Sequence, residues 1–322
     1  MNGYTAPGGL SLHRTAASSS GIRPKINGVL AIALSAVIFL APVALGSNRP
    51  LAWTAWAMVI GTLTMVACLA NAMSGQALRF GLARIRLETI LFACLIGYLV
   101  VQVLPIGRFS IPNSAGLDMA TAQISIAPGA TALMTMRMLT YGLFTFLMLQ
   151  VTVNASRRRS MLNAILVIVL VHAAYSLIAL FQFGDTILGA EKWTYVGSAT
   201  GTFVNRNSFA TFLSLGAAIA SANLASAMAR GGRENAGSSS ALYILALLIL
   251  LVTVIVTNSR MGLVVWCTAT MIPFVCLLIK MQISRPMIAV VTLVTLGALV
   301  LVFTLYGSTL ISRIWLVGDN LD

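Results

Sequence analysis

Charged side chains are scarce in this sequence. Of its 322 residues, 8% are charged and 59% are hydrophobic, and the mean hydropathy is +0.95. Because an ordinary soluble domain is about 25% charged, this composition excludes a soluble globular protein and indicates several helices that cross a membrane. Hydrophobic and polar residues do not alternate with a period of two, which argues against an outer-membrane β-barrel.

Residues that bind metals or exchange protons are also few. The sequence has 2 histidines, 4 cysteines and 7 acidic residues. The cysteines all lie inside apolar runs and lack metal-ligand spacing, so we interpret them as small buried hydrophobic residues. The acidic residues on the predicted outer side form no carboxylate pair suited to Mg²⁺. We therefore expect neither a metal ion nor a cofactor.

Long apolar runs are what the sequence does contain. Nine of them are long enough, or nearly so, to cross a hydrocarbon core ~30 Å thick. We therefore predict an all-α bundle of about nine transmembrane helices over residues 26–308, after a flexible cytoplasmic tail at 1–25 and before the start of an outer loop at 309–322. The predicted spans are 26–46, 51–71, 87–105, 131–153, 161–182, 207–229, 241–257, 262–280 and 286–307.

The net charge of +13 follows the predicted topology. Lysine and arginine are concentrated in alternate loops, as they are in the cytoplasmic loops of membrane proteins. We therefore place the N-terminus in the cytoplasm and attribute the basic composition to topology rather than to nucleic-acid binding. The residues assigned to the cytoplasmic side are Arg14, Arg23, Lys25, Arg79, Arg84, Arg86, Arg157, Arg158, Arg159, Arg230, Arg233, Lys280 and Arg285.

The stretch from Gly201 to Ala210 places an arginine between two asparagines at the start of a predicted helix. Asn205 or Asn207 can cap this helix, since an Asx side chain accepts hydrogen bonds from its first N–H groups. A helix start with a guanidinium, here that of Arg206, favours an anion. The alternative is an interfacial arginine whose head reaches to water.

Two further arginines are predicted on the same side of the membrane. Arg260 lies in a very short turn between spans seven and eight, where it could also serve only to anchor the interface. Arg137 lies about six residues, or ~9 Å, inside span four. Three guanidiniums on one outer face would suit a diphosphate, whose oxygens accept forked contacts. His172, near the middle of its span, is expected to be a packed, hydrogen-bonded residue of the helix interior.

Two motifs together resemble the O-antigen ligase superfamily. The segment from Gly201 to Ala210 resembles its GTF-x-N-x-N-x-FA signature, and the segment from Thr257 to Gly262 resembles its T-x-S-R-x-G signature. The stretch from Tyr175 to Phe183 is similar to the Y-G-L-x-Q segment that precedes the first motif. The match covers roughly residues 85–315.

The resemblance implies a bacterial inner-membrane protein that acts on the periplasmic face. Members of the family include O-antigen ligases, polysaccharide polymerases and protein O-oligosaccharyltransferases. They transfer glycan from an undecaprenyl-diphosphate donor to the hydroxyl of a glycolipid, polysaccharide or protein acceptor, without metal or nucleotide. On this chain, Arg206 and Arg260 would hold the donor diphosphate near Asn205 and Asn207, with Arg137 assisting, and fixed cations would stabilise the charge growing on the leaving group.

The sequence departs from the family pattern after the second motif. The family carries a large periplasmic loop with a histidine thought to act in catalysis, and this sequence ends at Asp322 without one. We therefore expect a truncated or degenerate member that binds donor without transferring it, with no catalytic residue assigned. The alternative is a transporter or flippase-like carrier of an anionic lipid-linked substrate. A metabolite channel is a third alternative that fits the sequence less well. The clustering of polar features on the outer side favours the transferase.

Overall fold

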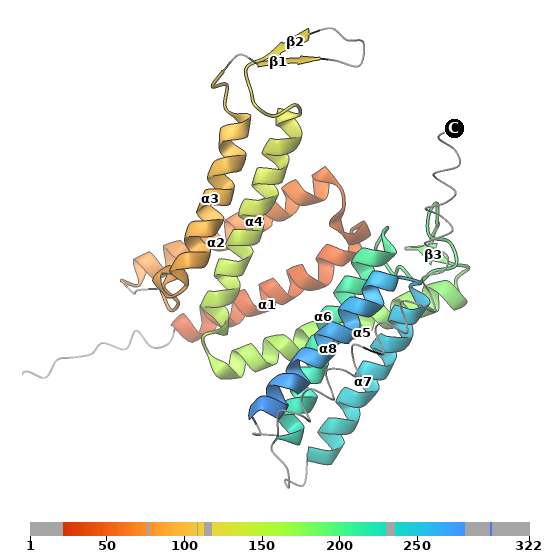
Figure 1. Cartoon of the computed structure of the whole chain (residues 1–322). Helices are drawn as coiled ribbons and strands as arrows, with labels where there is room; N and C mark the ends of the chain where they lie inside the picture. The colour runs from red at the N-terminus through yellow and green to blue at the C-terminus, as the bar shows by residue number, and fades with distance from the viewer. Residues whose placement is uncertain are drawn as a thin grey trace, which may run out of the picture.

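The computed structural model describes residues 22–75, 78–107, 109–112, 118–229 and 236–280, together with residue 297. These residues form eight α-helices (Figure 1). The helices are α1 (Ile22–Val43), α2 (Pro50–Met73), α3 (Arg86–Val103), α4 (Pro128–Thr152), α5 (Ala155–Phe181), α6 (Arg206–Met228), α7 (Ala236–Val256) and α8 (Arg260–Lys280). Two short 3₁₀ helices, η1 (Leu45–Ser47) and η2 (Leu82–Ile85), precede α2 and α3.

Six of the described helices, α2 to α6 and α8, are long and apolar enough to cross a membrane. The fully described apolar parts of the other two helices are shorter: Asn27–Val43 in α1 and Ser240–Val256 in α7. This confirms the prediction of an all-α protein with membrane-spanning helices. The ninth predicted span, 286–307, and the outer segment 309–322 lie outside the described residues. The count of nine spans and the orientation of the N-terminus stay predictions, and α1 begins inside the predicted tail.

The loop between α3 and α4 and the loop between α5 and α6 each contain a small hairpin that was not predicted from the sequence. In the first, β1 (Phe109–Pro112) pairs antiparallel with β2 (Asp118–Thr121), and Phe109 lies opposite Thr121. This hairpin extends beyond the ends of α3 and α4 (Figure 1). In the second, β3 (Thr186–Ile187) pairs with β4 (Ala190–Glu191) in the loop that leads to α6.

The helix starts follow the local sequence. Proline, which has no N–H to leave unbonded, occupies the first turn of α2 at Pro50 and of α4 at Pro128. Asn154 caps α5, since its side chain accepts a hydrogen bond of 3.0 Å from the N–H of Arg157. This cap explains why α5 begins at Ala155, about six residues before the predicted span: polar residues extend the helix by more than one turn beyond its apolar part.

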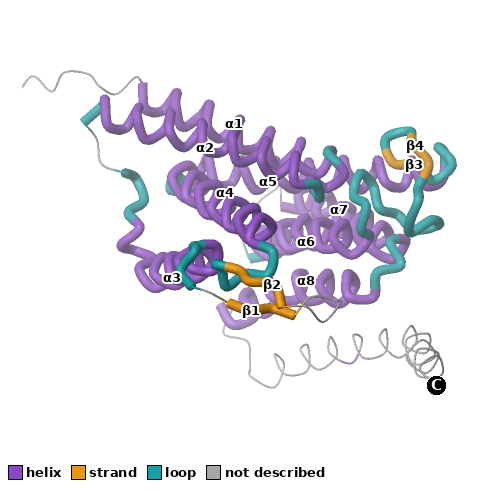
Figure 2. Tube along the Cα trace, turned by 90° about the horizontal axis from the view of Figure 1, so that it is seen from above, coloured by secondary structure: helices purple, strands orange, loops and turns teal. Residues whose placement is uncertain are grey.

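The helices pack as two groups (Figures 1 and 2). Helices α2 to α4 lie on one side and α6 to α8 on the other, and α1 and α5 run between them. Each group has its own buried cluster of side chains. One cluster comes from α5, α6 and α7 and includes Val169, Leu213 and Leu250. The other comes mainly from α1, α2 and α4 and includes Leu34, Ile60 and Leu147.

Helix α6 is the most enclosed of the described spans. In its most apolar stretch 61% of the residues are buried, whereas the corresponding fraction is 6% for α2 and zero for α3. Its small residues allow the neighbouring helices to approach closely. At Gly216, the space beside Val169 of α5 and Leu250 of α7 is too small for a side chain. The motif at the start of α6 is therefore held by the most central helix of the bundle.

The interpretation of the cysteines as buried residues is wrong. Cys68, Cys94 and Cys276 are exposed on the surface of the helices, and Cys267 is only half-buried. In a membrane bundle, apolar residues need no protein around them, because lipid tails are as apolar as a protein core. An apolar run therefore does not distinguish an inward-facing cysteine from one that faces lipid.

Candidate functional site

The starts of α6 and α8 are joined by a hydrogen bond between the two motifs. The Ser259 hydroxyl donates to Oδ1 of Asn207 at 2.8 Å, across 52 residues of sequence. The same hydroxyl accepts a 3.0 Å hydrogen bond from the N–H of Gly262 and so caps α8. Asn205 caps α6, because its Oδ1 accepts from the N–H of Asn207 at 2.8 Å. Two capped helix starts therefore lie side by side.

A close approach between α6 and α8 keeps these two starts together. A Cβ atom on Gly262 would lie 2.3 Å from Cβ of Ala210 and 2.8 Å from Oγ of Ser259, far inside van der Waals contact. Gly262 closes the second motif and Ala210 closes the first. The glycine of T-x-S-R-x-G is thus required by packing, and only a residue without a side chain fits here.

The glycine that opens the first motif has a similar physical reason. Gly201 has φ of +57°, a conformation that side chains disfavour, and its missing Cβ would lie 3.1 Å from the ring of Phe209. Phe209 is fully buried and packs against Phe203, with ring centroids 5.5 Å apart. The motif residues therefore fold the chain tightly back on the first turn of α6.

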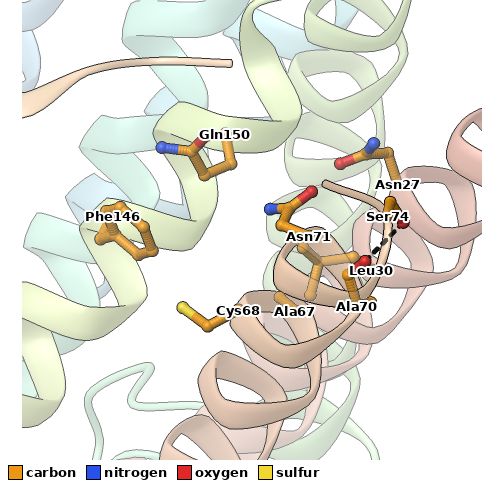
Figure 3. Close-up of a pocket in the computed structure, with 9 residues that line it drawn as sticks. All are labelled: Asn27, Leu30, Ala67, Cys68, Ala70, Asn71, Ser74, Phe146 and Gln150. Atoms are coloured by element: carbon orange, nitrogen blue, oxygen red, sulfur yellow. Dashed lines mark hydrogen bonds between the residues drawn. The ribbon is translucent and has the colours of Figure 1, made fainter. Parts of the chain in front are cut away.

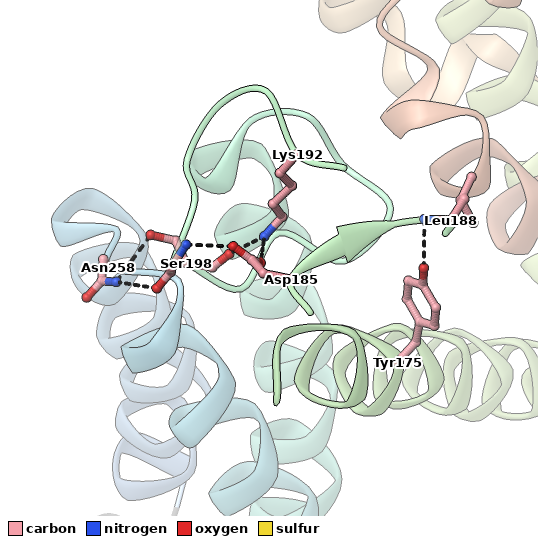
Figure 4. A network of polar contacts seen from close by, with 7 residues as sticks. Tyr175, Asp185, Leu188, Lys192, Ser198 and Asn258 are labelled. Carbon is pink, nitrogen blue, oxygen red and sulfur yellow. Dashed lines mark hydrogen bonds and ion pairs between the residues drawn. The ribbon is translucent and has the colours of Figure 1, made fainter. Parts of the chain in front are cut away.

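The loop before α6 is held by a buried ion pair, drawn in Figure 4. Lys192 and Asp185 form the only salt bridge in the described part of the chain, and their side chains are 3% and 15% exposed. Lys192 also donates to the carbonyl oxygen of Ser198 at 2.6 Å, and Asp185 accepts from the N–H of Gly197 at 2.6 Å. One ion pair thus fixes both ends of this loop.

Further hydrogen bonds attach this loop to α5 and to the turn between α7 and α8. Asn258 donates to the Ser198 hydroxyl at 3.2 Å, and the N–H of Ala199 donates to the carbonyl of Val256 at 3.0 Å. On the other side, the Tyr175 hydroxyl accepts from the N–H of Leu188 at 2.9 Å (Figure 4). The sequence did not predict the pairing of Asp185 with Lys192, since nothing in their spacing marks the contact.

Arg206 is the first residue of α6 and is half-buried. Its guanidinium carbon lies 5.1 Å from the centre of the Tyr195 ring, a cation–π contact with the preceding loop. Within the described ranges, its buried Nε has no hydrogen-bond partner, and the buried hydroxyls of Thr200 and Thr202 have none either. Only one other buried side-chain polar atom in those ranges, Nε1 of Trp266, is unsatisfied. Unmet polar atoms are rare in proteins and require an explanation.

The five predicted site residues therefore fall into two places. Asn205, Arg206, Asn207 and Arg260 are all at the joined helix starts, and Arg260, the first residue of α8, directly follows Ser259. Arg137 has different neighbours: it stacks on Trp53 of α2 and Tyr141 of α4, with 4.6 and 5.5 Å to their ring centres. A common contact of all three arginines with one diphosphate stays a prediction.

His172 is packed as predicted. It is 3% exposed, and its Nδ1 lies 2.9 Å from the carbonyl oxygen of Ile168 one turn earlier. The rings of Phe39 and Phe212 meet it edge-on, at centroid distances of 5.5 and 5.4 Å. This histidine therefore has the contacts of a core residue.

A small polar crevice lies between the first turns of α1 and the last turns of α2 and α4 (Figure 3). Its volume is about 20 Å³, enough for a single water molecule. Asn71 and Ser74 line it, as does Gln150, whose amide binds both the N–H and the carbonyl of Phe80 at 3.1 and 2.8 Å. The crevice is too small for a substrate. In the ranges the structure describes, no three histidine, cysteine or acidic side chains come together to hold a metal ion.

The fold and the apolar helices define the chain as a helical membrane protein. No protein-family model, curated protein or solved structure matches it.

Proposed function

We propose that this protein is a membrane glycosyltransferase of the O-antigen ligase type. It takes glycan from an undecaprenyl-diphosphate donor and transfers it to an acceptor hydroxyl on the periplasmic face of the inner membrane. The joined starts of α6 and α8 bind the donor diphosphate, and the arginines that begin these helices, Arg206 and Arg260, contact its oxygens.

The assembly of the two motifs supports this proposal. Four matching positions have a part in bringing the helix starts together: Gly201 and Gly262 by leaving space, and Asn207 and Ser259 by hydrogen bonding. Arg206 begins α6 and Arg260 begins α8, and the dipole of each helix favours an anion at its start. The same motifs thus supply both the residues that join the helix starts and the arginines that carry positive charge there.

The observation that carries the proposal is the concentration of unmet polar atoms at this place. Three of the four buried, unpartnered side-chain polar atoms in the described residues lie between positions 200 and 206. A threonine hydroxyl and a guanidinium Nε are both hydrogen-bond donors. Donors without protein acceptors, next to two positive helix ends, are suited to a ligand rich in anionic oxygens.

The chemistry requires positive charge at this location. In transfer, the bond between the anomeric carbon of the glycan and a diphosphate oxygen breaks, and the acceptor oxygen bonds to the same carbon. The acceptor gives its proton to a general base, and the diphosphate leaves with an additional negative charge. Guanidiniums held by packed helices stabilise that charge without reorganising, which lowers the barrier to reaction.

The test uses the whole 322-residue chain in a strain without its own ligase, with glycan transfer and donor binding measured at equal expression. The 322 residues should bind donor without transferring glycan, and Arg206→Ala and Arg260→Ala should each weaken that binding by about tenfold or more. In a longer version that supplies a general base, each substitution should lower transfer by about 10²-fold or more. Arg→Lys at either position should recover little, because an ammonium lacks the forked geometry. Arg49→Ala is the matched control, since Arg49 is an exposed arginine at the start of α2.

Two results would contradict the proposal. Equal effects of substitutions at Arg49 and Arg206 would mean that the helix starts do not form the diphosphate site. Movement of donor across a vesicle membrane, without any glycan transfer, would identify the protein as a carrier whose arginines bind substrate only.

A further inference from the structure

A second cavity, distinct from the joined helix starts, opens between α1, α2, α4 and α6. Its volume is about 340 Å³, within the range of small-molecule sites. Six aromatic side chains dominate its wall around one cation, Arg137 of α4, and neither Arg206 nor Arg260 lines it. The six aromatic residues are Trp53, Trp56, Tyr141, Phe144, Phe203 and Phe212.

The aromatic wall is held in place by the η1 turn. Nε1 of Trp53 donates to the carbonyl oxygen of Ser47 at 2.7 Å, and Nε1 of Trp56 donates to the hydroxyl of Ser47 at 2.8 Å. With their polar edges bonded, the two indoles present apolar surface to the cavity. The ring of Phe203 packs so tightly on Gly46 that a Cβ there would lie 2.7 Å from it. The space is therefore bounded by fixed side chains.

Arg137 is incompletely satisfied in this setting. It is half-buried and lies nine residues into α4, about 13 Å along the helix from Pro128. Its Nε donates to the Tyr141 hydroxyl at 2.6 Å, and within the described part of the chain no acidic group pairs with it. A guanidinium has five N–H donors, and a cation at membrane depth is costly unless an anion or water compensates it.

We propose that this cavity binds an anionic phospholipid of the outer leaflet. Its phosphate accepts hydrogen bonds from the Nη groups of Arg137, and part of an acyl chain lies against the aromatic wall. The ligand has to be amphiphilic, because the site offers one cation and otherwise mainly apolar surface. This proposal stands independently of the transferase activity.

Charge favours a phospholipid over the donor diphosphate. A phosphodiester carries one negative charge, and the cavity offers one guanidinium. The diphosphate carries more charge and has more oxygens to satisfy, which suits the two arginines at the joined helix starts. The aromatic faces also suit an acyl chain, since burial of each methylene contributes to binding.

Binding is measured by native mass spectrometry on the full chain, delipidated in detergent and titrated separately with phosphatidylglycerol, phosphatidylcholine and polyprenyl phosphate. We expect one phosphatidylglycerol to bind at least about tenfold more tightly than zwitterionic phosphatidylcholine. Arg137→Gln should abolish this preference, a loss of about tenfold or more in phosphatidylglycerol affinity. Arg137→Lys should retain part of it, and Arg49→Gln, which removes an exposed arginine outside the cavity, should leave it unchanged.

A second variant separates volume from charge and is useful if Arg137→Gln does not fold. Ala41→Leu keeps the arginine but fills part of the cavity from α1, and it should weaken phosphatidylglycerol binding severalfold. Equal losses in Arg137→Gln and Arg49→Gln would overturn the proposal, because binding would then reflect general surface charge. Tight binding of polyprenyl phosphate without phosphatidylglycerol would overturn it too and would assign the cavity to the donor.

Discussion

The joined helix starts and the Arg137 cavity both involve α6 or the segment leading into it, yet they are built in opposite ways. At the joined starts, the structure leaves no room: Gly262 and Gly201 are required because a side chain would clash. At the cavity, about 340 Å³ remains open between four helices. The helix starts of the first region are joined by a side-chain hydrogen bond from Ser259 to Asn207, whereas Arg137 of the second region stacks on aromatic rings from two helices.

Backbone strain occurs in both regions. All six described non-glycine residues with positive φ lie either in the loops around the helix starts or in the η1 turn beside the cavity. Such residues cost about 1–3 kcal/mol each and persist only where the surroundings enforce them. A polar network enforces these backbone conformations around the helix starts, and an aromatic wall enforces them beside the cavity. The six are Leu45, Ser47, Asp185, Leu188, Tyr195 and Asn258.

The largest expected effect comes from breaking the polar network of the first region. Lys192→Met leaves the carboxylate of Asp185 buried without its cation and removes the bond to Ser198. We expect a loss of about 3 kcal/mol in the free energy of unfolding. Thermal unfolding in detergent measures it, with Glu191→Gln, an exposed neighbour, as the control that should change stability by less than about 0.5 kcal/mol. Equal melting temperatures of the two variants would exclude a structural role for the ion pair.

The next effect tests the close packing of α6 and α8. Gly262→Ala forces a methyl group against Ala210, and we expect it to destabilise the protein by about 2 kcal/mol. Gly61→Ala is the matched control: Gly61 lies within α2 with nothing within 4 Å of its missing Cβ, so alanine should be neutral or stabilising by up to about 1 kcal/mol. Both are measured in the same thermal assay. A harmless Gly262→Ala would mean that the helices separate more easily than the structure indicates.

A smaller effect is expected from the bond that joins the two motifs. Ser259→Ala removes the cap of α8 together with the contact to Asn207, at a cost of about 1–2 kcal/mol. Ser160→Ala removes an exposed hydroxyl that binds only within its own helix and should be almost silent. If the serine variants unfold alike, the joined starts are held by apolar packing alone.

The smallest effect on stability is expected from a substitution in the cavity. Ala41→Leu adds three carbon atoms where space exists, so we expect stability to change by less than about 0.5 kcal/mol. The contrast with Gly262→Ala is informative because one added methyl group destabilises one region while a larger addition is tolerated in the other. A loss as large as that of Gly262→Ala would show that the cavity wall is as tightly packed as the helix starts.

Much of the fold could be predicted from hydropathy. Eight predicted spans coincide with described helices, because a stretch of about 20 apolar residues has few alternatives to a membrane helix. The sequence also predicted that either Asn205 or Asn207 caps the helix that follows them. In the structure, Asn205 is the cap of α6. These are local features, determined by residues close together in sequence.

The rest depends on contacts between residues far apart in the chain. In a membrane helix that is apolar on all sides, hydropathy does not reveal the face that packs, so neither the burial of α6 nor the exposure of Cys68 could be predicted. The pairing of Asn258 with Ser198 joins residues 60 positions apart. The aromatic surroundings of Arg137 depend on Trp53 from another helix, which no spacing rule connects to it.

Phe203 belongs to both regions, since it forms part of the cavity wall and lies three residues before Arg206. An occupant of the cavity that shifts this ring also shifts the segment leading into α6. Affinity at the helix starts would then depend on occupancy of the cavity, and thermodynamic reciprocity requires the same factor in the opposite direction. The composition of the surrounding bilayer would thereby act as an effector of the anion site, and the single aromatic residue between them would set the coupling free energy.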